Sequence, residues 1–303
     1  MEIIHLKREE INDNQWNKCI KVSFNGIVYG YTWYLDLVCE HWEALVDQHY
    51  ETVMPITFKK KFGIPYLFQP LFTQQLGVFS QNLLNEQIVE KYIAAIPSRY
   101  KFIEINLNSF NKISDNSTIH RKYRTTYQLD LIGDYTSLYK NYATNTKRNL
   151  KKALAKQITI VENLSPNELL KLKRENQRVP LTEDNLSLSM RIVTNAVRFK
   201  IANIYGAYNS ENTLCAACCF ITSHNKTIML LAVSNEEGKM NGAMSQIINT
   251  HIKHNVEKSL ILDFEGSDIP GLARFYSGFG AIPCKYMQIK INRLPWLVKW
   301  LKR

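Results

Sequence analysis

The sequence predicts an α+β protein made of two tandem domains. The chain has 303 residues, which favours two domains of about 150 residues each. Strand-like alternation and helix-like apolar spacing follow one another along the whole chain. The order strand, loop, helix, strand occurs twice, and the first strands of the two copies, Leu76–Ser80 and Leu230–Ser234, lie about 155 residues apart. We therefore expect domains at residues 1–133 and 134–303, with residues 292–303 able to pack back onto the first domain.

The first domain is predicted to begin with a short helix over Asn14–Val22. The apolar residues between Leu83 and Ile93 have the spacing of an amphipathic helix, and Pro97 ends it. Alternating or apolar segments predict the strands of this domain. These are Glu51–Phe58, Ile64–Phe68, Leu76–Ser80, Lys101–Leu107 and Tyr123–Leu131.

The second domain is predicted to begin with one helix over Thr136–Lys156, capped by Asp134. The segment from Ser165 to Glu168 is a capping box with proline at the first helical position. A glycine-containing loop over Asn235–Gly242 leads into the next long helix. Further helices are predicted at Ser187–Phe199, Ala243–Val256 and Pro270–Phe279, and strands at Ile158–Val161, Ile204–Tyr208, Leu214–Thr222, Thr227–Val233, Ser259–Phe264 and Lys285–Ile291.

Positive charge is concentrated in two short segments. The net charge is +11. Residues 134–157 hold six bases and one acid, and residues 285–303 hold six bases and no acid, so the rest of the chain holds 26 of each. Localised positive charge indicates a polyanionic partner such as nucleotide phosphates, tRNA or anionic lipid, and solvated helix faces are the alternative.

The cysteine and histidine patterns do not predict a metal site. Cys215 and Cys218 have a metal-like spacing, but they lie three apart on one predicted strand and so face opposite sides of the sheet. We expect buried thiols that act as small apolar groups. His251, His254 and Glu257 curl around a predicted helix, and we expect exposed polar side chains there rather than metal ligands.

The chain has no apolar run near the ~18 residues that a membrane-spanning helix needs. Its first residues lack the order of a signal peptide, so a cytoplasmic location is expected. The aromatic and basic end, Pro295–Arg303, suits weak contact with a membrane surface, although packing onto the protein is favoured over it.

Strand, glycine loop, helix and strand are followed by Asp263-Phe264-Glu265-Gly266-Ser267 and by a short helix that carries Phe275-Tyr276-Ser277-Gly278-Phe279-Gly280. This combination resembles GNAT acyltransferases, and its C-terminal half resembles the Fem-type (FemABX) peptidyltransferases. The resemblance implies two GNAT-like domains, each a mixed, mostly antiparallel sheet flanked by helices. It also implies transfer of an acyl or aminoacyl group to a small-molecule or peptide amine.

The resemblance assigns roles to the residues that match its motifs. The turn Gly238, Lys239, Asn241, Gly242 and Ala243 would bind pyrophosphate through backbone amides at a helix start. The strand residues Leu231, Val233 and Ser234 would hold the acyl carbonyl through backbone amides. The basic helix face of Lys147, Arg148, Lys151 and Lys152 would meet a nucleotide diphosphate or tRNA.

Catalytic candidates come from the same motifs. Fem-type enzymes tend to have Phe-Lys where this chain has Phe275-Tyr276. In coenzyme A-dependent GNAT enzymes a tyrosine at the matching place protonates the departing thiolate, and with an ordinary pKa of about 10 Tyr276 would be protonated at neutral pH. Asp263 and Glu265 alternate to the same face of a predicted strand, so either could act as base or hold the amine. Structural roles, as a core aromatic for Tyr276 and as a cap or ion pair for the carboxylates, are the alternatives.

Acyl-CoA is the expected donor, and two alternatives remain. Tyr276 and the glycine turn favour acyl-CoA as co-substrate. The basic helix favours the alternative, a Fem-like peptidyltransferase that uses aminoacyl-tRNA on a peptidoglycan precursor. A non-catalytic nucleotide- or RNA-binding module on the same fold is the alternative outside enzymes.

Overall fold

The chain forms two compact units. The computed structural model describes residues 2–176, 181–266 and 268–294. Unit 1 contains the residues up to Arg124 and the described residues from Lys285 onward, and unit 2 is Thr125–Cys284. The expected division after residue 133 placed the last strand in the second domain. In the structure this strand, β14 (Ile282–Asn292), pairs antiparallel with β7 (Phe102–Asn106), which explains why the residues after 284 group with unit 1.

Unit 1 contains two sets of paired strands. One is an antiparallel sheet in the order β1-β2-β3-β6. In the other, β4 pairs antiparallel with β5, β5 runs parallel to β7, and β7 pairs with β14. The strands not yet given are β1 (Ile3–Leu6), β2 (Glu43–Asp47), β3 (Thr52–Ile56), β4 (Phe58–Lys61), β5 (Ile64–Leu67) and β6 (Phe79–Ser80), and the helices are η1 (Arg8–Glu10), α1 (Asp13–Val22), η2 (Val28–Gly30), α2 (Thr32–Val38) and α3 (Glu86–Ala94).

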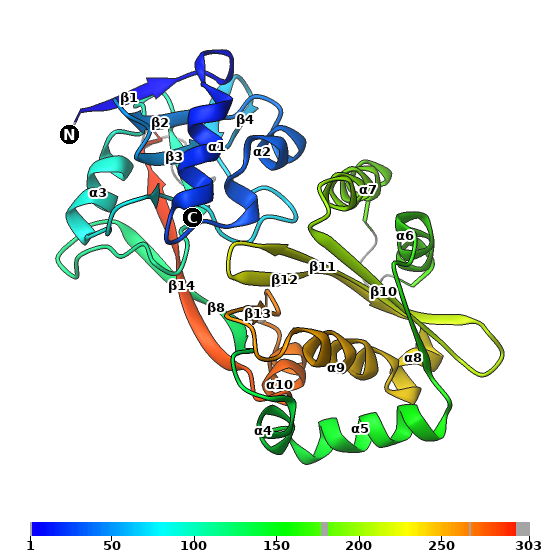
Figure 1. The fold of residues 1–303 in the computed structure, drawn as a ribbon. Coiled ribbons are helices and arrows are strands. Elements are labelled where there is room, and N and C mark those ends of the chain that lie inside the picture. The colour runs from blue at the N-terminus through cyan, green and yellow to red at the C-terminus, as the bar shows by residue number, and fades with distance from the viewer. Residues whose placement is uncertain (1, 177–180, 267, 295–303) are drawn as a thin grey trace. The chain divides into compact units, whose positions relative to one another are not determined.

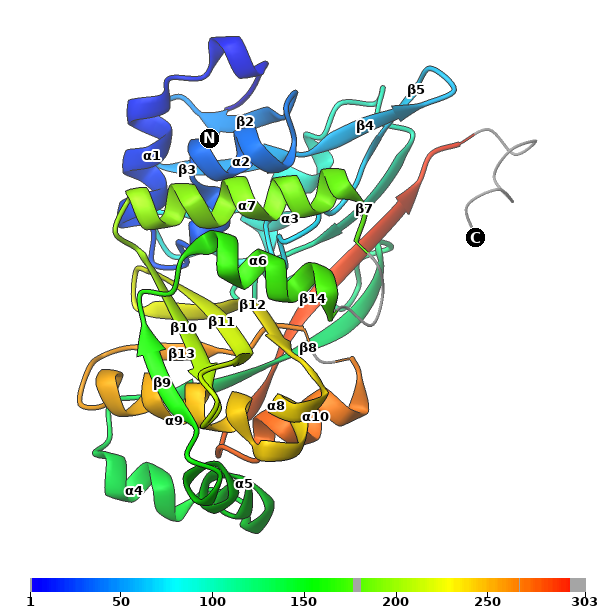
Figure 2. The same cartoon turned by 90° about the vertical axis from the view of Figure 1, so that its right-hand side faces the viewer.

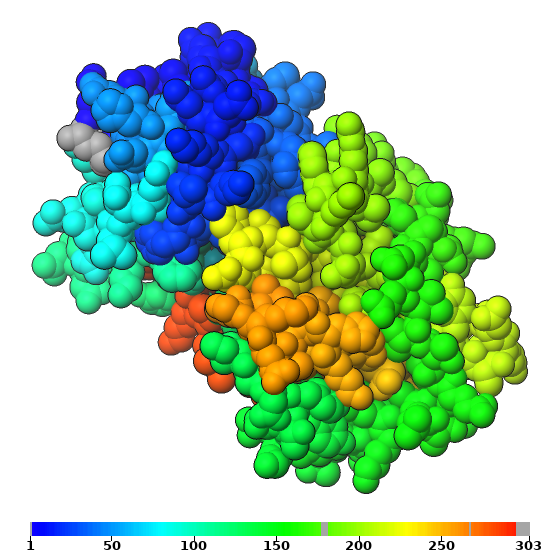
Figure 3. Space-filling view, viewed as in Figure 1, coloured from blue at the N-terminus to red at the C-terminus, as the bar shows by residue number. Residues whose placement is uncertain are grey.

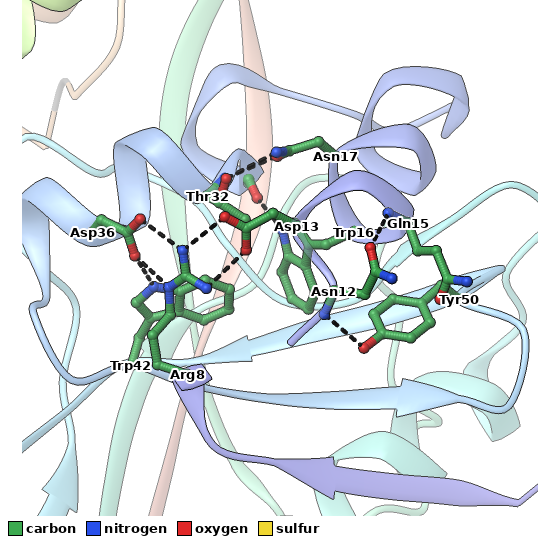
Figure 4. A network of polar contacts seen from close by, with 11 residues as sticks. Arg8, Asn12, Asp13, Gln15, Trp16, Asn17, Thr32, Asp36, Trp42 and Tyr50 are labelled. Atoms are coloured by element: carbon green, nitrogen blue, oxygen red, sulfur yellow. Dashed lines mark hydrogen bonds and ion pairs between the residues drawn. The ribbon is translucent and has the colours of Figure 1, made fainter. Parts of the chain in front are cut away.

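A polar network ties the first helices of unit 1 together (Figure 4). The Arg8 guanidinium donates to both carboxylate oxygens of Asp36 at 2.6 and 2.9 Å and to those of Asp13 at 2.7 and 3.0 Å. It also lies 5.3 Å from the ring centre of Trp42, which packs on Trp16. Two carboxylates and an aromatic face hold one cation, so Arg8 links α1 and α2 to the sheet.

Unit 2 is built on one sheet with the strand order β8-β13-β12-β11-β10-β9. All neighbours in it are antiparallel except β12 and β13. Its strands are β8 (His120–Asp130), β9 (Thr159–Glu162), β10 (Ala202–Tyr208), β11 (Leu214–Ser223), β12 (Lys226–Ser234) and β13 (Ile261–Asp263), and its helices are α4 (Tyr135–Lys140), α5 (Thr144–Ala155), α6 (Pro166–Glu175), α7 (Glu183–Arg198), α8 (Glu236–Asn241), α9 (Ala243–Asn255) and α10 (Pro270–Ser277).

Helices cover both faces of this sheet. Figures 1 and 2 show α6 and α7 on one face of β10–β12 and α9 on the other. Ile247, Ile248 and Ile252 of α9 belong to the same buried cluster as Cys218 and Phe220 of β11. Because β11 is buried from both sides, it is apolar along nearly its whole length rather than alternating.

Several local predictions are confirmed. Ser165 and Glu168 form the predicted capping box at the start of α6, with Pro166 in the first turn. Asp134 caps α4 by accepting from the Ser137 amide at 3.0 Å. The predicted thiols are buried: Cys215 and its two neighbouring cysteines in β11 have no exposed surface.

Three predictions are wrong. The single helix expected over Thr136–Lys156 is two helices, because residues 141–143 leave the helical path between α4 and α5. The loop expected over Asn235–Gly242 contains the helix α8. His251 is fully buried rather than exposed, and its ring stacks on Phe220 at 3.8 Å between centroids.

None of the described helices combines the length and the apolar composition that crossing a bilayer requires.

Candidate functional site

Strands β12 and β13 separate partway along unit 2. Their parallel pairing runs only from Lys226↔Ile261 to Ile228↔Asp263, whereas β12 continues to Ser234. β13 ends at Asp263, and two residues later Glu265 has the left-handed φ of 54°. The second half of β12 is therefore paired with β11 on one side, and no strand of the described residues lies along its other edge.

A β-bulge lies where the two strands part. Cys219 pairs with Leu231, and Phe220 pairs with Met229, so Leu230 is an extra residue in β12. A bulge changes which backbone groups point toward the neighbouring strand. The groups of β12 beyond the bulge therefore follow a different alternation from those before it.

The register fixes the direction of each backbone group beyond the bulge. The Asn235 amide donates to the Cys215 carbonyl at 3.0 Å, so these opposite residues form a hydrogen-bonded pair. Such pairs alternate along an antiparallel ladder, so Val233 also bonds to β11. Ala232 and Ser234 then point their N–H and C=O groups away from β11. We call these groups of Ala232 and Ser234 the open edge of β12.

The structure changes the residues predicted to hold a carbonyl. Ser234 is at the open edge, as predicted. Leu231 and Val233 instead pair with β11 through their backbones, and the two residues are only 5% and 6% exposed. Within the expected range Leu231–Ser234, Ala232 is the other residue whose N–H points away from β11, as the pairing register and the bulge show.

A lysine that the sequence did not single out reaches the open edge. Lys173 lies in α6, and its Nζ is 3.5 Å from the carbonyl oxygen of Ala232. The side chain is partly buried, and burial lowers the pKa of its ammonium group below the ordinary value. Its neighbours Lys171 and Arg174 are exposed on the same helix, so nothing in the sequence pattern distinguishes Lys173.

Tyr276 lies in the core of unit 2 beside the end of β13. Its ring stacks on Phe264 at 4.8 Å between centroids, and the residue is 6% exposed. Burial raises the pKa of the phenol, and the neighbouring Cys218 and Glu265 raise it further. Among the described residues no hydrogen-bond partner holds its hydroxyl. The phenol is therefore protonated at neutral pH, as predicted, within an apolar setting.

Asp263 and Glu265 do not share a strand face. β13 ends at Asp263, and the left-handed backbone at Glu265 breaks the alternation on which that prediction depended. Asp263 is 2% exposed and accepts hydrogen bonds from Gln128 at 2.8 Å, from Lys226 at 3.3 Å and from the Glu265 amide at 3.0 Å, as well as from Thr126. Its carboxylate is occupied in joining β8, β12 and the turn after β13, which is a structural role.

The predicted pyrophosphate turn is closed by the protein itself at Gly238. Asn235 caps α8 by accepting from the Gly238 amide at 2.8 Å. A Cβ on Gly238 would lie 2.2 Å from the Cys215 carbonyl oxygen, and one on Gly242 would lie 2.5 Å from that of Asn149. Gly242 also has the left-handed φ of 76°. These glycines allow α8 and α5 to pack closely against β11 and the start of α9.

The other residues of this turn also have partners inside the protein. Lys239 forms an ion pair with Glu236, and Asn241 donates to Glu237 at 3.2 Å. Ala243 is fully buried at the start of α9. Bare amides at Gly238 are therefore not available to a phosphate.

Helix α5 carries the predicted basic face. Thr146, Leu150 and Ala153 are buried, and the bases lie on the other side of the helix. Lys147 donates to the Lys140 carbonyl at 2.9 Å and Arg148 donates to Asn145 at 2.6 Å. Arg148, Lys151 and Lys152 are exposed, and the green atoms of this segment lie at the surface in Figure 3.

Two further predictions concern metal ligands and the C-terminal tail. Within the described residues, no group of three His, Cys, Asp or Glu side chains could hold a metal ion. Ser267 and the tail Pro295–Arg303 lie outside the described residues, so the prediction of weak surface contact by the tail stays a prediction.

Comparisons with known proteins give the fold. No family model and no curated protein matches the sequence. Among solved structures, FemX matches with a TM-score of 0.66 and 14% identity over 100% of both chains. A tandem GNAT protein from the clavulanic acid biosynthesis pathway matches with a TM-score of 0.54 and 11% identity over 97% of this chain and 99% of that one. The fold is the tandem GNAT fold.

A third solved structure also matches the chain over most of its length. L-PGS from Bacillus licheniformis matches with a TM-score of 0.58 and 10% identity over 96% of this chain and 95% of that chain. The predicted fold, two GNAT-like domains with mixed sheets and flanking helices, is confirmed. Where β12 and β13 part, backbone groups of β12 in unit 2 point away from β11 without a described strand opposite them.

Proposed function

We propose that the protein is an N-acyltransferase that moves an acyl or aminoacyl group from an activated ester or thioester to an amine. The observation that carries the proposal is the open edge of β12. There the N–H groups of Ala232 and Ser234 point away from β11, beyond the end of the pairing with β13. Fixed N–H groups aimed at a carbonyl oxygen stabilise the negative charge that develops on it during attack by an amine.

Proline substitutions test this role of the backbone. Ala232→Pro removes an N–H that points to the open edge. It leaves the hydrogen bonds between β12 and β11 in place. We expect the transfer rate to fall by about 10²-fold, the usual cost of losing one such donor, with little change in Tm. Val233→Pro is the matched control, because it removes a ladder hydrogen bond and should lower Tm strongly. Full activity of Ala232→Pro would contradict the proposal.

For the donor we propose an RNA carrier, as in the Fem-like aminoacyl-tRNA alternative. Two observations support it over acyl-CoA. The glycines of the turn before α9 contact backbone carbonyls of the protein and so leave Gly238 no bare amide for a pyrophosphate. Helix α5 presents Arg148, Lys151 and Lys152 to solvent, and an exposed row of cations suits a phosphate backbone.

Acyl-CoA is the second candidate, and Tyr276 favours it. A buried, protonated phenol beside the end of β13 can give its proton to a departing thiolate. A departing ribose hydroxyl needs a proton as well, so the phenol does not exclude the RNA carrier. The two carriers therefore differ in what holds the phosphates, not in the chemistry at β12.

Ligand-dependent melting separates the carriers. We expect aminoacyl-tRNA to raise Tm, and acetyl-CoA and longer acyl-CoAs to leave it unchanged. Replacing Lys151 and Lys152 by glutamate should weaken tRNA binding at least tenfold and reduce the slope of log Kd against log salt by about 2, one for each lost phosphate contact. Glutamates at the exposed Lys171 and Lys200 provide the control of equal charge. A Tm rise with CoA compounds alone would reverse the assignment of the donor.

A further inference from the structure

Lys173 occupies an unusual position for a lysine on a surface helix. Its neighbours on α6, Lys171 and Arg174, are exposed, whereas Lys173 is partly buried and its Nζ lies 3.5 Å from the Ala232 carbonyl oxygen. Lysine heads normally remain in water, because removing the charge from solvent is costly. Here the head group lies at the edge of β12 where we place the reacting carbonyl.

Among the described residues no carboxylate forms an ion pair with this ammonium group, and its Nζ donates to the Ala232 carbonyl. Burial is the one cause of its lowered pKa, and no neighbouring charge contributes. Several ionisable groups on α6 and on the elements packed against it have other partners: Glu183 binds Arg174, Glu168 binds Ser165 and Tyr208, and Lys226 binds Asp263. Burial raises the pKa values of Tyr205, Cys215, Cys218 and Cys219. The remaining charged residues of α6 and α7 are exposed: Lys171, Glu175, Asp184, Arg191 and Arg198.

A lysine without a counter-ion in a partly buried site loses its proton more easily than an exposed one. In its neutral form the amine has a lone pair that can accept a proton, while one N–H still donates to the Ala232 carbonyl. An amine substrate arrives mostly as an ammonium ion and must lose a proton before it can attack. Asp263 is occupied by its own hydrogen bonds, so it does not supply this base.

We propose that Lys173 is the base that accepts the proton of the attacking amine. This assignment rests on the proposed acyl transfer. Neutral Lys173 takes one proton from R–NH3+, and the resulting R–NH2 forms a C–N bond to the acyl carbon. The carbonyl electron pair moves to the oxygen, which the N–H groups of Ala232 and Ser234 hold. When that pair returns, the bond to the carrier breaks, the departing oxygen or sulfur takes a second proton from the nitrogen, and Lys173 releases its proton to water.

Two substitutions of Lys173 separate a base from a fixed positive charge. Lys173→Met keeps the length of the side chain without an ionisable group, and Lys173→Arg keeps a charge that cannot be removed near neutral pH. We expect both variants to lower kcat/KM by 10²-fold or more. In the wild-type protein kcat/KM should rise with pH as Lys173 loses its proton, and this increase should be absent from both variants. Lys171→Met, two residues away and exposed, is the control and should keep the wild-type rate.

The readouts are transfer from aminoacyl-tRNA and from acetyl-CoA to a panel of amines between pH 6 and 10, together with thermal unfolding. Lys173→Met should raise Tm most at neutral pH, where wild type carries a buried charge, and this gain should shrink as the pH approaches 10.5, because the unfolded state binds the extra proton only below that value. Wild-type activity in Lys173→Arg or Lys173→Met would overturn the role of Lys173 alone. Absence of transfer by the wild-type protein with every donor would overturn the proposed function, and the base with it.

Discussion

At the scale of single residues, the polar groups inside unit 2 differ in how completely their hydrogen bonds are satisfied. The Asp263 carboxylate accepts hydrogen bonds from four groups, and these bonds hold neighbouring parts of unit 2 together. Lys173 has one long contact to a carbonyl, and the Tyr276 hydroxyl has none to a described residue. Buried polar groups with few hydrogen bonds are the better candidates for catalysis. A group whose hydrogen bonds are all formed would have to break some of them before it could react.

His251 gives a prediction about pH at this scale. It is fully buried, stacks on Phe220 and lies 3.3 Å from the Thr227 hydroxyl, and burial lowers its pKa to about 3, with smaller contributions from His254 and Lys258. The unfolded state, with a pKa near 6.5, binds the proton first as the pH falls, so stability decreases below about pH 6.5.

We expect the protein to lose about 2 kcal/mol of unfolding free energy between pH 7 and pH 5 through this group. The measurement is urea unfolding at both pH values. His251→Gln should be less stable than wild type at pH 7 but should show a smaller loss between the two. An equal loss in both proteins would contradict the buried, neutral state of His251.

At the scale of elements, the segment between β12 and α9 shows how a glycine pattern can have two meanings. Glycine permits close approach of a ligand or of the protein's own backbone, and the sequence is the same in both cases. Here Asn235 caps α8, and Gly238 and Gly242 lie against the carbonyls of Cys215 and Asn149. The packing of α5 and α8, not the presence of glycine, determines that backbone carbonyls of the protein lie against Gly238 and Gly242.

Alanine substitutions test this packing. Gly238→Ala should lower the unfolding free energy by about 2 kcal/mol or more, because its Cβ would lie 2.2 Å from a backbone carbonyl oxygen that has little room to move. Gly271→Ala in α10 is the control, because no atom lies within 4 Å of its added Cβ. The control should be neutral or slightly stabilising. The measurement is Tm, and an unchanged Tm in Gly238→Ala would show that the turn is looser than described.

At the scale of the whole molecule, the last strand, β14, contributes to the core of unit 1. β14 pairs with β7, and Met287 and Ile289 lie in the buried core of unit 1 together with Ile103 and Ile105. The chain thus leaves unit 1 after Arg124 and returns to it from Lys285. A division based on sequence order placed all residues after 133 in one domain, because order along the chain contains no information on such a return.

Truncation of Ile289 tests this division. Ile289→Ala should cost about 3 kcal/mol, as for a fully buried isoleucine, and should reduce hydrogen-exchange protection in β3, α3 and β7. Ile282→Ala is the control, because Ile282 is 68% exposed. Loss of protection in α9 and β11 instead would assign β14 to unit 2.

Local signals in the sequence were sufficient for most helices and strands and for the fold. The capping box at Ser165 and the apolar run of β11 act over a few residues, so the chain itself encodes them. The resemblance carried by the motifs around Asp263 and Tyr276 gave the tandem GNAT fold, and the solved structures confirm it.

Only the tertiary structure decided which backbone groups of β12 point away from β11 beyond the end of its pairing with β13. The open edge depends on the bulge at Leu230 and on the end of the β12–β13 pairing, which are properties of register between strands. Lys173 reaches Ala232 from a helix 59 residues earlier in the chain. Backbone direction and long-range contact arise from pairing and packing, so they have no signature in neighbouring residues, whereas helix caps and buried strands do.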